Sequence, residues 1–134
     1  MFTTNKFCAA PVLVCKKMLA EDSGTISSVV INSGCANACT GTKGEQDSEA
    51  TVAMVSEQGL GRSLVMSTGV IGPFLDMSKI SLGVTEAAAK LSPAGWEETS
   101  RAIMTTDTRP KLFTRTYTGL QKGCGRLFAL CFCS

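Results

Sequence analysis

The run SLVMSTGVIGP, residues 63–73, constrains the fold more than any other stretch of this chain. Its first part, Ser63–Ser67, is a short apolar run of the kind that forms a strand. Thr68 and Gly69 break that pattern, and a helical pattern follows Pro73. A strand that leads through a turn of small residues into a helix is a building unit of α/β folds.

The other segments also mix strand and helix patterns, judged by their apolar periodicity and their turn and capping residues. We therefore predict an α/β (α+β) fold, a layered α-β-β-α sandwich of which this chain holds the amino-terminal part. The predicted strands are Ala9–Val14, an edge strand because of Pro11, then Ser27–Ile31, Ser63–Ser67 and Leu112–Thr118. The predicted helices run from Asp47 or Ser48 to Gln58, from near Asp76 or Ser78 to about Leu91, and from Ser92-Pro93 with Trp96, Ser100 and Ile103 on one side.

Composition excludes several classes of function. Thirteen Lys and Arg against eleven Asp and Glu give a net charge of +2 with no basic run, which argues against a nucleic-acid or membrane partner. Apolar runs such as Ala9–Cys15 fall far short of the roughly 18 residues that span a bilayer. The chain has no histidine to activate Ser67 and no Gly-x-Ser-x-Gly, so a serine hydrolase is excluded.

The cysteines indicate neither a disulfide framework nor a metal site. There are seven, an odd number, and Asn-x-Ser/Thr acceptors are absent, so we expect reduced thiols. Cys35 and Cys39 stand four apart and Cys131 and Cys133 two apart, but without histidine a zinc site would need four thiolates together. We expect no metal, with Cys35 and Cys39 as small buried side chains.

Two glycine-rich turns are the candidates for chemistry. Ile31–Gly41, INSGCANACTG, leaves a strand through residues small enough for a backbone or a ligand to approach closely. At the second turn, Thr68 and Gly69 can aim a hydroxyl and a main-chain N–H at one point, as in an oxyanion hole. The pattern alone leaves open a simpler interpretation, in which these small residues only form a β–α corner.

Five segments occur in the order seen in the ornithine acetyltransferase (glutamate N-acetyltransferase) family. Residues 1–125 resemble the amino-terminal, or alpha, portion of that family, most closely its fungal branch, and 126–134 form a divergent hydrophobic tail. The segments are Phe2–Val12, Ile31–Gly41, Ser67–Gly72, Ala102–Lys111 and Lys122–Gly125.

The resemblance implies an acetyltransferase of arginine biosynthesis. An acetyl group passes from N-acetylornithine to glutamate through an acetyl-threonine enzyme, which is covalent catalysis. In the family the precursor cuts itself, and the amino-terminal threonine of the beta chain is the nucleophile with its own α-amine as base, so no histidine is needed. The implied partners are the two small substrates and the beta chain, in a heterotetramer-like assembly. No cofactor is expected, although acetyl-CoA serves some members as donor. The fungal likeness implies the mitochondrial matrix, and the alternative is the cytoplasm if the protein is bacterial or untargeted.

The resemblance also assigns site residues. Thr68 and Gly69 match the residues that stabilise the oxyanion. Thr105 matches a substrate-binding threonine, with Thr106 as the candidate if the register slips by one, and Lys122 matches a lysine suited to a substrate carboxylate. The alternative is that the two threonines only end the third predicted helix and that the lysine is solvated.

The chain departs from the family after Gly125. The family pattern places the nucleophilic threonine eleven residues after the lysine, where this chain has Cys133 in an unrelated context. We therefore expect the chain to be an incomplete acetyltransferase that needs a beta chain. The alternative is a catalytically inactive, truncated or frame-disrupted fragment with at most a binding role.

Overall fold

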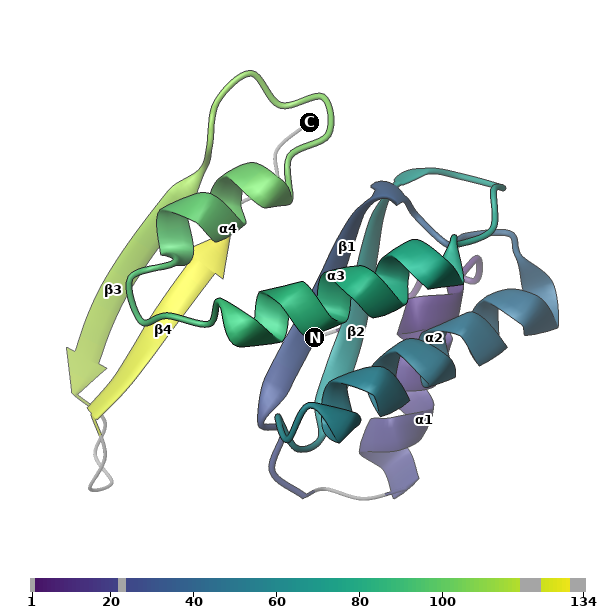
Figure 1. Ribbon diagram of the computed structural model, residues 1–134, viewed down its shortest axis with the longest axis horizontal. Coiled ribbons are helices and arrows are strands. Elements are labelled where there is room, and N and C mark those ends of the chain that lie inside the picture. The colour runs from purple at the N-terminus through teal and green to yellow at the C-terminus, as the bar shows by residue number, and fades with distance from the viewer. Residues whose placement is uncertain (1, 22–23, 119–123, 131–134) are drawn as a thin grey trace. The chain divides into compact units, whose positions relative to one another are not determined.

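The computed structural model describes residues 2–21, 24–118 and 124–130. They divide into two compact units, Met1–Leu91 and Ser92–Ser134, and each unit contains a two-stranded sheet (Figure 1). The predicted mixture of helices and strands is confirmed. None of the helices in these described stretches is long and apolar enough to cross a membrane.

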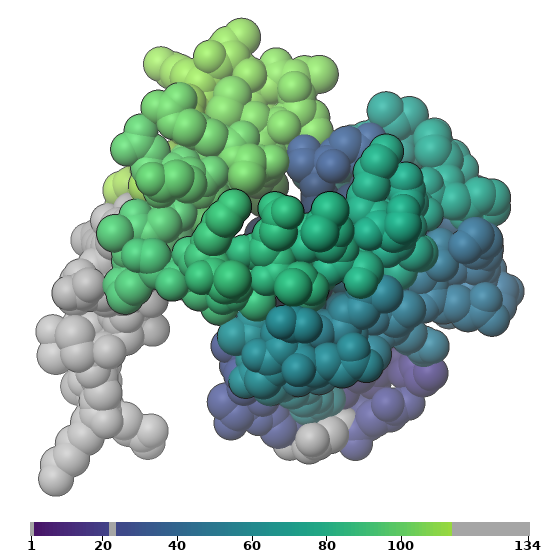
Figure 2. All heavy atoms as spheres, viewed as in Figure 1, coloured from purple at the N-terminus to yellow at the C-terminus, as the bar shows by residue number. Residues whose placement is uncertain are grey.

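The amino-terminal unit is built on a parallel pair of strands. In β1, Ser28–Cys35, and β2, Ser63–Val70, the first residues lie opposite each other and so do the last. Helix α2, Gly41–Glu57, connects the two strands, as a parallel pair requires a crossover. Figure 2 shows α2 and α3, Met77–Ala89, on the surface of this unit.

One face of this sheet carries the core. Val14 and Cys15 of α1, Ala10–Glu21, pack against Val65 of β2. Val30, opposite Val65 in the register, joins the same cluster. Burying aliphatic side chains of this size stabilises a fold by about 1.5–3 kcal/mol each. Hydrophobic contact in this cluster therefore holds α1 against the sheet.

The opposite face of the sheet is open in the described part of the chain. Side chains alternate along a strand, so Val29, Met66 and Val70 point away from the core cluster. They are 52%, 45% and 62% exposed. An apolar sheet face left uncovered is what one half of a layered sandwich presents.

The strand predicted at Ala9–Val14 is wrong, because α1 begins at Ala10 and includes the rest of this segment. Pro11 lies in the first helical turn, where its fixed φ suits a helix and its missing N–H costs nothing. The buried residues Ala10, Val14 and Cys15 recur at helical spacing, and this periodicity outweighs the β-branched composition.

Two other predicted helices start elsewhere. Helix α2 begins at Gly41, six residues before the predicted cap, and Asp47 and Ser48 are buried inside it rather than capping it. Helix α4, Trp96–Ala102, begins three residues after Pro93. The end of α2 at Glu57 and the cap of α3 at Asp76, whose carboxylate accepts from Lys79 N–H, agree with the prediction.

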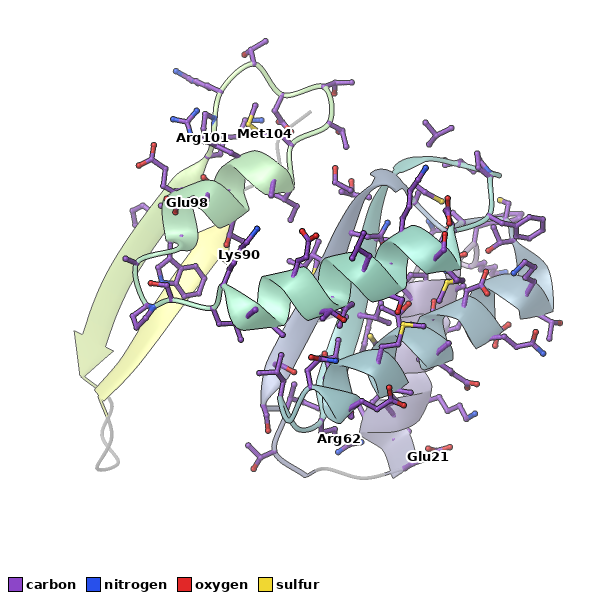
Figure 3. The ribbon with its side chains drawn as sticks, in the orientation of Figure 1. Glu21, Arg62, Lys90, Glu98, Arg101 and Met104 are labelled. Atoms are coloured by element: carbon purple, nitrogen blue, oxygen red, sulfur yellow. The ribbon has the colours of Figure 1, made fainter. Side chains whose placement is uncertain are left out.

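Arg62, which precedes β2, connects the strand to the end of α1. Its guanidinium donates to the carbonyl oxygens of Met18 and Gly24 near the carboxyl end of that helix, close to Glu21 in Figure 3. A cation at this end also interacts favourably with the helix dipole.

The second unit contains α4, β3, Leu112–Thr118, and β4, Cys124–Leu130. The two strands pair antiparallel, with Leu112 opposite Leu130. Strand β3 has the predicted bounds, whereas β4 occupies part of the segment interpreted as a hydrophobic tail. Of the predicted helical side, Ser100 and Ile103 are buried, whereas Trp96 is 37% exposed.

Candidate active site

The predicted end of the strand at Ser67 is wrong, because β2 continues through Thr68 and Gly69, which pair with Ser33 and Gly34 of β1. Thr68 and Gly69, still called the oxyanion turn below, therefore lie in the last part of the strand.

The end of β2 lies beside the loop that follows β1. Two main-chain hydrogen bonds join them: Ala36 N–H donates to Val70 O at 2.9 Å, and Gly72 N–H donates to Ala38 O at 3.1 Å. The Cys35 thiol adds a bond to a carbonyl oxygen, that of Pro73, at 3.3 Å. Val70 and the residues just after it are therefore held against the loop that follows β1.

Thr68 projects from the open face of the sheet. It alternates with Val65 and Ser67, which face the helices, and it shares its face with the exposed Met66 and Val70. Within the described residues its hydroxyl makes no hydrogen bond. The hydroxyl is therefore available to a ligand on that face.

The N–H of Gly69 points away from β1. Val70 O accepts from Ala36 N–H, directly after β1, so the main-chain N–H and C=O of Val70 point toward β1. The main-chain groups of successive residues in a strand point to opposite sides, so those of Gly69 point to the other edge. Val65 lies four residues earlier, so its main-chain groups point to the same side as those of Gly69. Its N–H and C=O both bond to the Cys15 thiol, which confirms that this side faces away from β1. No acceptor for Gly69 N–H lies among the residues that the structure describes.

Glycine is required at position 69 for two reasons. Its φ is +135°, a conformation that residues with a side chain rarely adopt. A Cβ there would lie 2.3 Å from the carbonyl carbon of Gly34 and 2.7 Å from the N of Cys35. The two strands therefore approach so closely at this point that only a glycine fits.

Sequence reasoning missed a side-chain bridge beside this turn. Ser67 Oγ donates to Asn32 Oδ1 at 2.6 Å, and Asn32 Nδ2 donates to Cys35 O at 2.9 Å. The only sequence signal is that Asn32 and Ser67 each lie two residues before a glycine, Gly34 and Gly69. That signal does not reveal that they meet, because 35 residues separate them.

A buried polar cluster supports the loop after β1. Asn37, fully buried with φ +48°, donates to Gly44 O and to Ser48 Oγ, both at 2.9 Å, and accepts from Thr40 Oγ1 at 2.8 Å. Asparagine tolerates this backbone better than most residues. Cys39, with φ +59°, is exposed, so the expectation of a buried side chain there is wrong. The turn forces it outward while Asn37 takes the interior.

Thr105 and Thr106 lie together in the second unit, after α4, and both are exposed. They come shortly after the end of α4, where Met104 N–H donates to Arg101 O at 3.2 Å. Figure 3 labels Arg101 and Met104. Nearby, Lys111 Nζ donates to Asp107 Oδ1 at 2.5 Å, and this bond holds the pKa of the Asp107 carboxyl below its usual value. Lys122 lies outside the described residues.

A separate cavity of about 250 Å³ lies between the sheet and two helices. Most of its lining is apolar, and Asn32 belongs to it whereas Thr68 and Gly69 do not. Among the described residues no group of three or more Cys, Asp or Glu side chains is placed to hold a metal ion. The lining comes from β1, β2, α2 and α3, and includes Val30, Thr51, Val65, Ile80 and Val84.

Comparisons with known proteins agree on one family. The ArgJ family model matches residues 1–129. Proteins named arginine biosynthesis bifunctional protein ArgJ, mitochondrial, from Aspergillus oryzae and Aspergillus clavatus are 51% and 49% identical over 97% and 95% of this chain. The chain spans about a third of the length of these curated relatives, 30% and 32%.

Solved structures give the same result. The crystal structure of arginine biosynthesis bifunctional protein ArgJ from Bacillus halodurans is 33% identical, with a TM-score of 0.82 over 99% of this chain and 70% of that chain. Ornithine acetyltransferase from Mycobacterium tuberculosis, complexed with ornithine, is 39% identical, with a TM-score of 0.72 over 83% of this chain and 62% of that one.

Proposed function

The chain belongs to the ArgJ family, and from that membership we propose that it supplies the oxyanion-stabilising turn of an acetyltransferase in arginine biosynthesis. The observation that carries the proposal is that two neighbouring hydrogen-bond donors are unpaired in the described part of the chain. The hydroxyl of Thr68 and the N–H of Gly69 have no acceptor among the described residues, and they belong to one residue and the peptide group that follows it. A single oxygen atom can therefore receive both.

The proposed reaction needs such a pair of donors. A threonine hydroxyl attacks the acetyl carbon of N-acetylornithine, its proton passes to an α-amine, and the carbonyl oxygen becomes an alkoxide. Collapse of this intermediate expels the ornithine amine, which takes up the proton, and leaves acetyl-threonine; glutamate then accepts the acetyl group by the reverse sequence. Loss of one preorganised donor to the alkoxide costs about 2.7–4 kcal/mol in similar sites.

The nucleophile comes, in this proposal, from a second polypeptide. Eleven residues after Lys122, where the family has its nucleophilic threonine, this sequence has Cys133. We propose that a beta chain supplies the threonine, in a heterotetramer-like assembly, and that Thr105, with Thr106 beside it, and Lys122 contribute to binding N-acetylornithine and glutamate. Acetyl-CoA is a possible second donor. The relatives from Aspergillus are named mitochondrial, and the matrix is the proposed location of this chain.

A second candidate is a binding role without catalysis. The observation that favours it is the sequence after Gly125, where Cys133 occupies the position at which the family has its nucleophile. Under this alternative the turn is intact, but no acetyl group is ever transferred.

Acetyl transfer by purified components distinguishes the two. The 134-residue chain is mixed with the carboxy-terminal polypeptide of the Aspergillus oryzae relative, and acetylglutamate formed from N-acetylornithine is measured. We expect no product from the chain alone, product from the mixture, and a kcat about 10²–10³-fold lower with Thr68→Ala. Thr42→Ala, an exposed threonine at the start of α2, is the matched control. Equal rates for the two variants, or no product from the mixture, would contradict the proposal.

A further inference from the structure

One side-chain amide connects the ends of β1 and β2. Asn32 lies opposite Ser67 in the parallel register. Its oxygen accepts from Ser67 Oγ at 2.6 Å, and its nitrogen donates to Cys35 O at 2.9 Å. Both ends of the amide are therefore used, and the bridge runs from the residue before Thr68 to the last residue of β1.

The bridge acts on the backbone at the point where the strands are closest. Cys35 O belongs to the residue whose N would lie 2.7 Å from a Cβ at position 69, and Ser67 is two residues before that position. Fixing Ser67 to Cys35 therefore fixes the peptide groups on either side of this contact. Asn32 and Ser67 are both partly buried, so water competes less for these bonds than at the surface.

We propose that Asn32 is a positioning residue for the oxyanion turn, acting through Ser67 to keep Gly69 N–H directed at the open edge of β2. This inference rests on the proposed function of that turn. A bridge that only stabilised the fold would, when removed, lower stability without redirecting the N–H of Gly69. If Asn32 positions the turn, the direction of the Gly69 N–H changes even in a variant that remains fully folded.

The test uses the ¹⁵N-labelled chain and a tetrahedral anion. Methylphosphonate resembles the intermediate of acetyl transfer, with a methyl group and anionic oxygens on one centre. The amide resonance of Gly69 is recorded, and the anion is titrated, in the wild type and in four variants. Asn32→Ala and Ser67→Ala remove the bridge, Ser67→Thr keeps the hydroxyl, and Val14→Ala lowers stability from the core of α1 without touching the bridge.

We expect the Gly69 resonance to shift in Asn32→Ala and Ser67→Ala and to stay in place in Ser67→Thr and Val14→Ala. Methylphosphonate should bind the first two variants about tenfold more weakly than wild type, as the loss of one good hydrogen bond implies. If Asn32→Ala does not fold, the pair Ser67→Ala and Ser67→Thr decides.

Two results separate this inference from the proposed function. An unchanged Gly69 resonance in both bridge variants would overturn the positioning role. A shifted resonance in those variants, with no response of wild-type Gly69 to methylphosphonate, would support positioning and contradict the oxyanion role of the turn.

Discussion

Replacing Gly69 by alanine tests whether the close approach of β1 and β2 is built into the backbone. The added Cβ would lie 2.3 Å from the carbonyl carbon and 2.6 Å from the carbonyl oxygen of Gly34. These are main-chain atoms of a paired strand, so no side-chain rotation relieves the overlap. The φ of +135° adds a second cost, because a residue with a side chain is strained in that region.

The two costs can be separated with glycines of this same chain. Gly34 has φ +104° but open space where its Cβ would be, so Gly34→Ala carries the strain alone, about 1–3 kcal/mol. Gly69→Ala adds the overlap, about another 1–3 kcal/mol, for a total of about 2–6 kcal/mol. Gly83→Ala, in the middle of α3 with open space at its Cβ, should instead stabilise the chain by up to about 1 kcal/mol.

Urea unfolding of the three variants and the wild type, followed by circular dichroism, gives the order. We expect stability to fall from Gly83→Ala through wild type and Gly34→Ala to Gly69→Ala. Shifts in midpoint at constant slope would report stability itself. Equal losses for Gly34→Ala and Gly69→Ala would show that the strands can separate at no cost, and the reasoning about this corner would fail.

Two further predictions concern the support of the same unit. Cys15→Ala leaves the buried N–H and C=O of Val65 without their thiol partner and should cost about 1–3 kcal/mol, whereas Cys15→Ser keeps a donor and acceptor and should cost less; urea midpoints compare the two, and equal losses would contradict this role. The Ser78 hydroxyl, and then Lys79 N–H, hold the pKa of Asp76 below its usual 3.8, so the stability it contributes is present above that pH and is lost as the pH falls through the lower, folded value. Thermal midpoints at acidic pH should therefore fall less steeply in Asp76→Asn, and parallel curves for the two proteins would refute this.

The elements that could be predicted are those whose signals are local. Asp76 caps α3 with its own side chain, and β3 is a β-branched run bounded by turn residues, so both were found from neighbouring residues alone. The start of α2 could not be found in this way. Its first residues are glycines and polar residues that resemble a loop, and they are helical because Asn37, from outside the helix, bonds to Gly44 and Ser48.

The same distinction applies to the candidate site. Thr68 and Gly69 are adjacent in sequence, so a motif could identify them, and their catalytic role stays a prediction. The bridge through Asn32 depends on register, because Asn32 meets Ser67 only when β1 and β2 pair with Ser28 opposite Ser63. Register is fixed by packing of the whole sheet and cannot be read from either strand.

Register also decides whether this turn can serve as an oxyanion site at all. A main-chain N–H in a sheet is normally paired, whereas a donor to a transient alkoxide must be unpaired and yet fixed in direction. Gly69 meets both conditions because alternate residues of β2 direct their N–H groups toward β1, and that of Gly69 points away from it. Cys15 already occupies the same edge at Val65, four residues earlier, and leaves the end of the strand open. A slip of one residue in which β2 turned over would direct the Gly69 N–H into the ladder and remove the donor. The glycine contact and the Asn32 bridge both oppose that slip, which gives the close approach of the two strands a chemical consequence as well as a structural one.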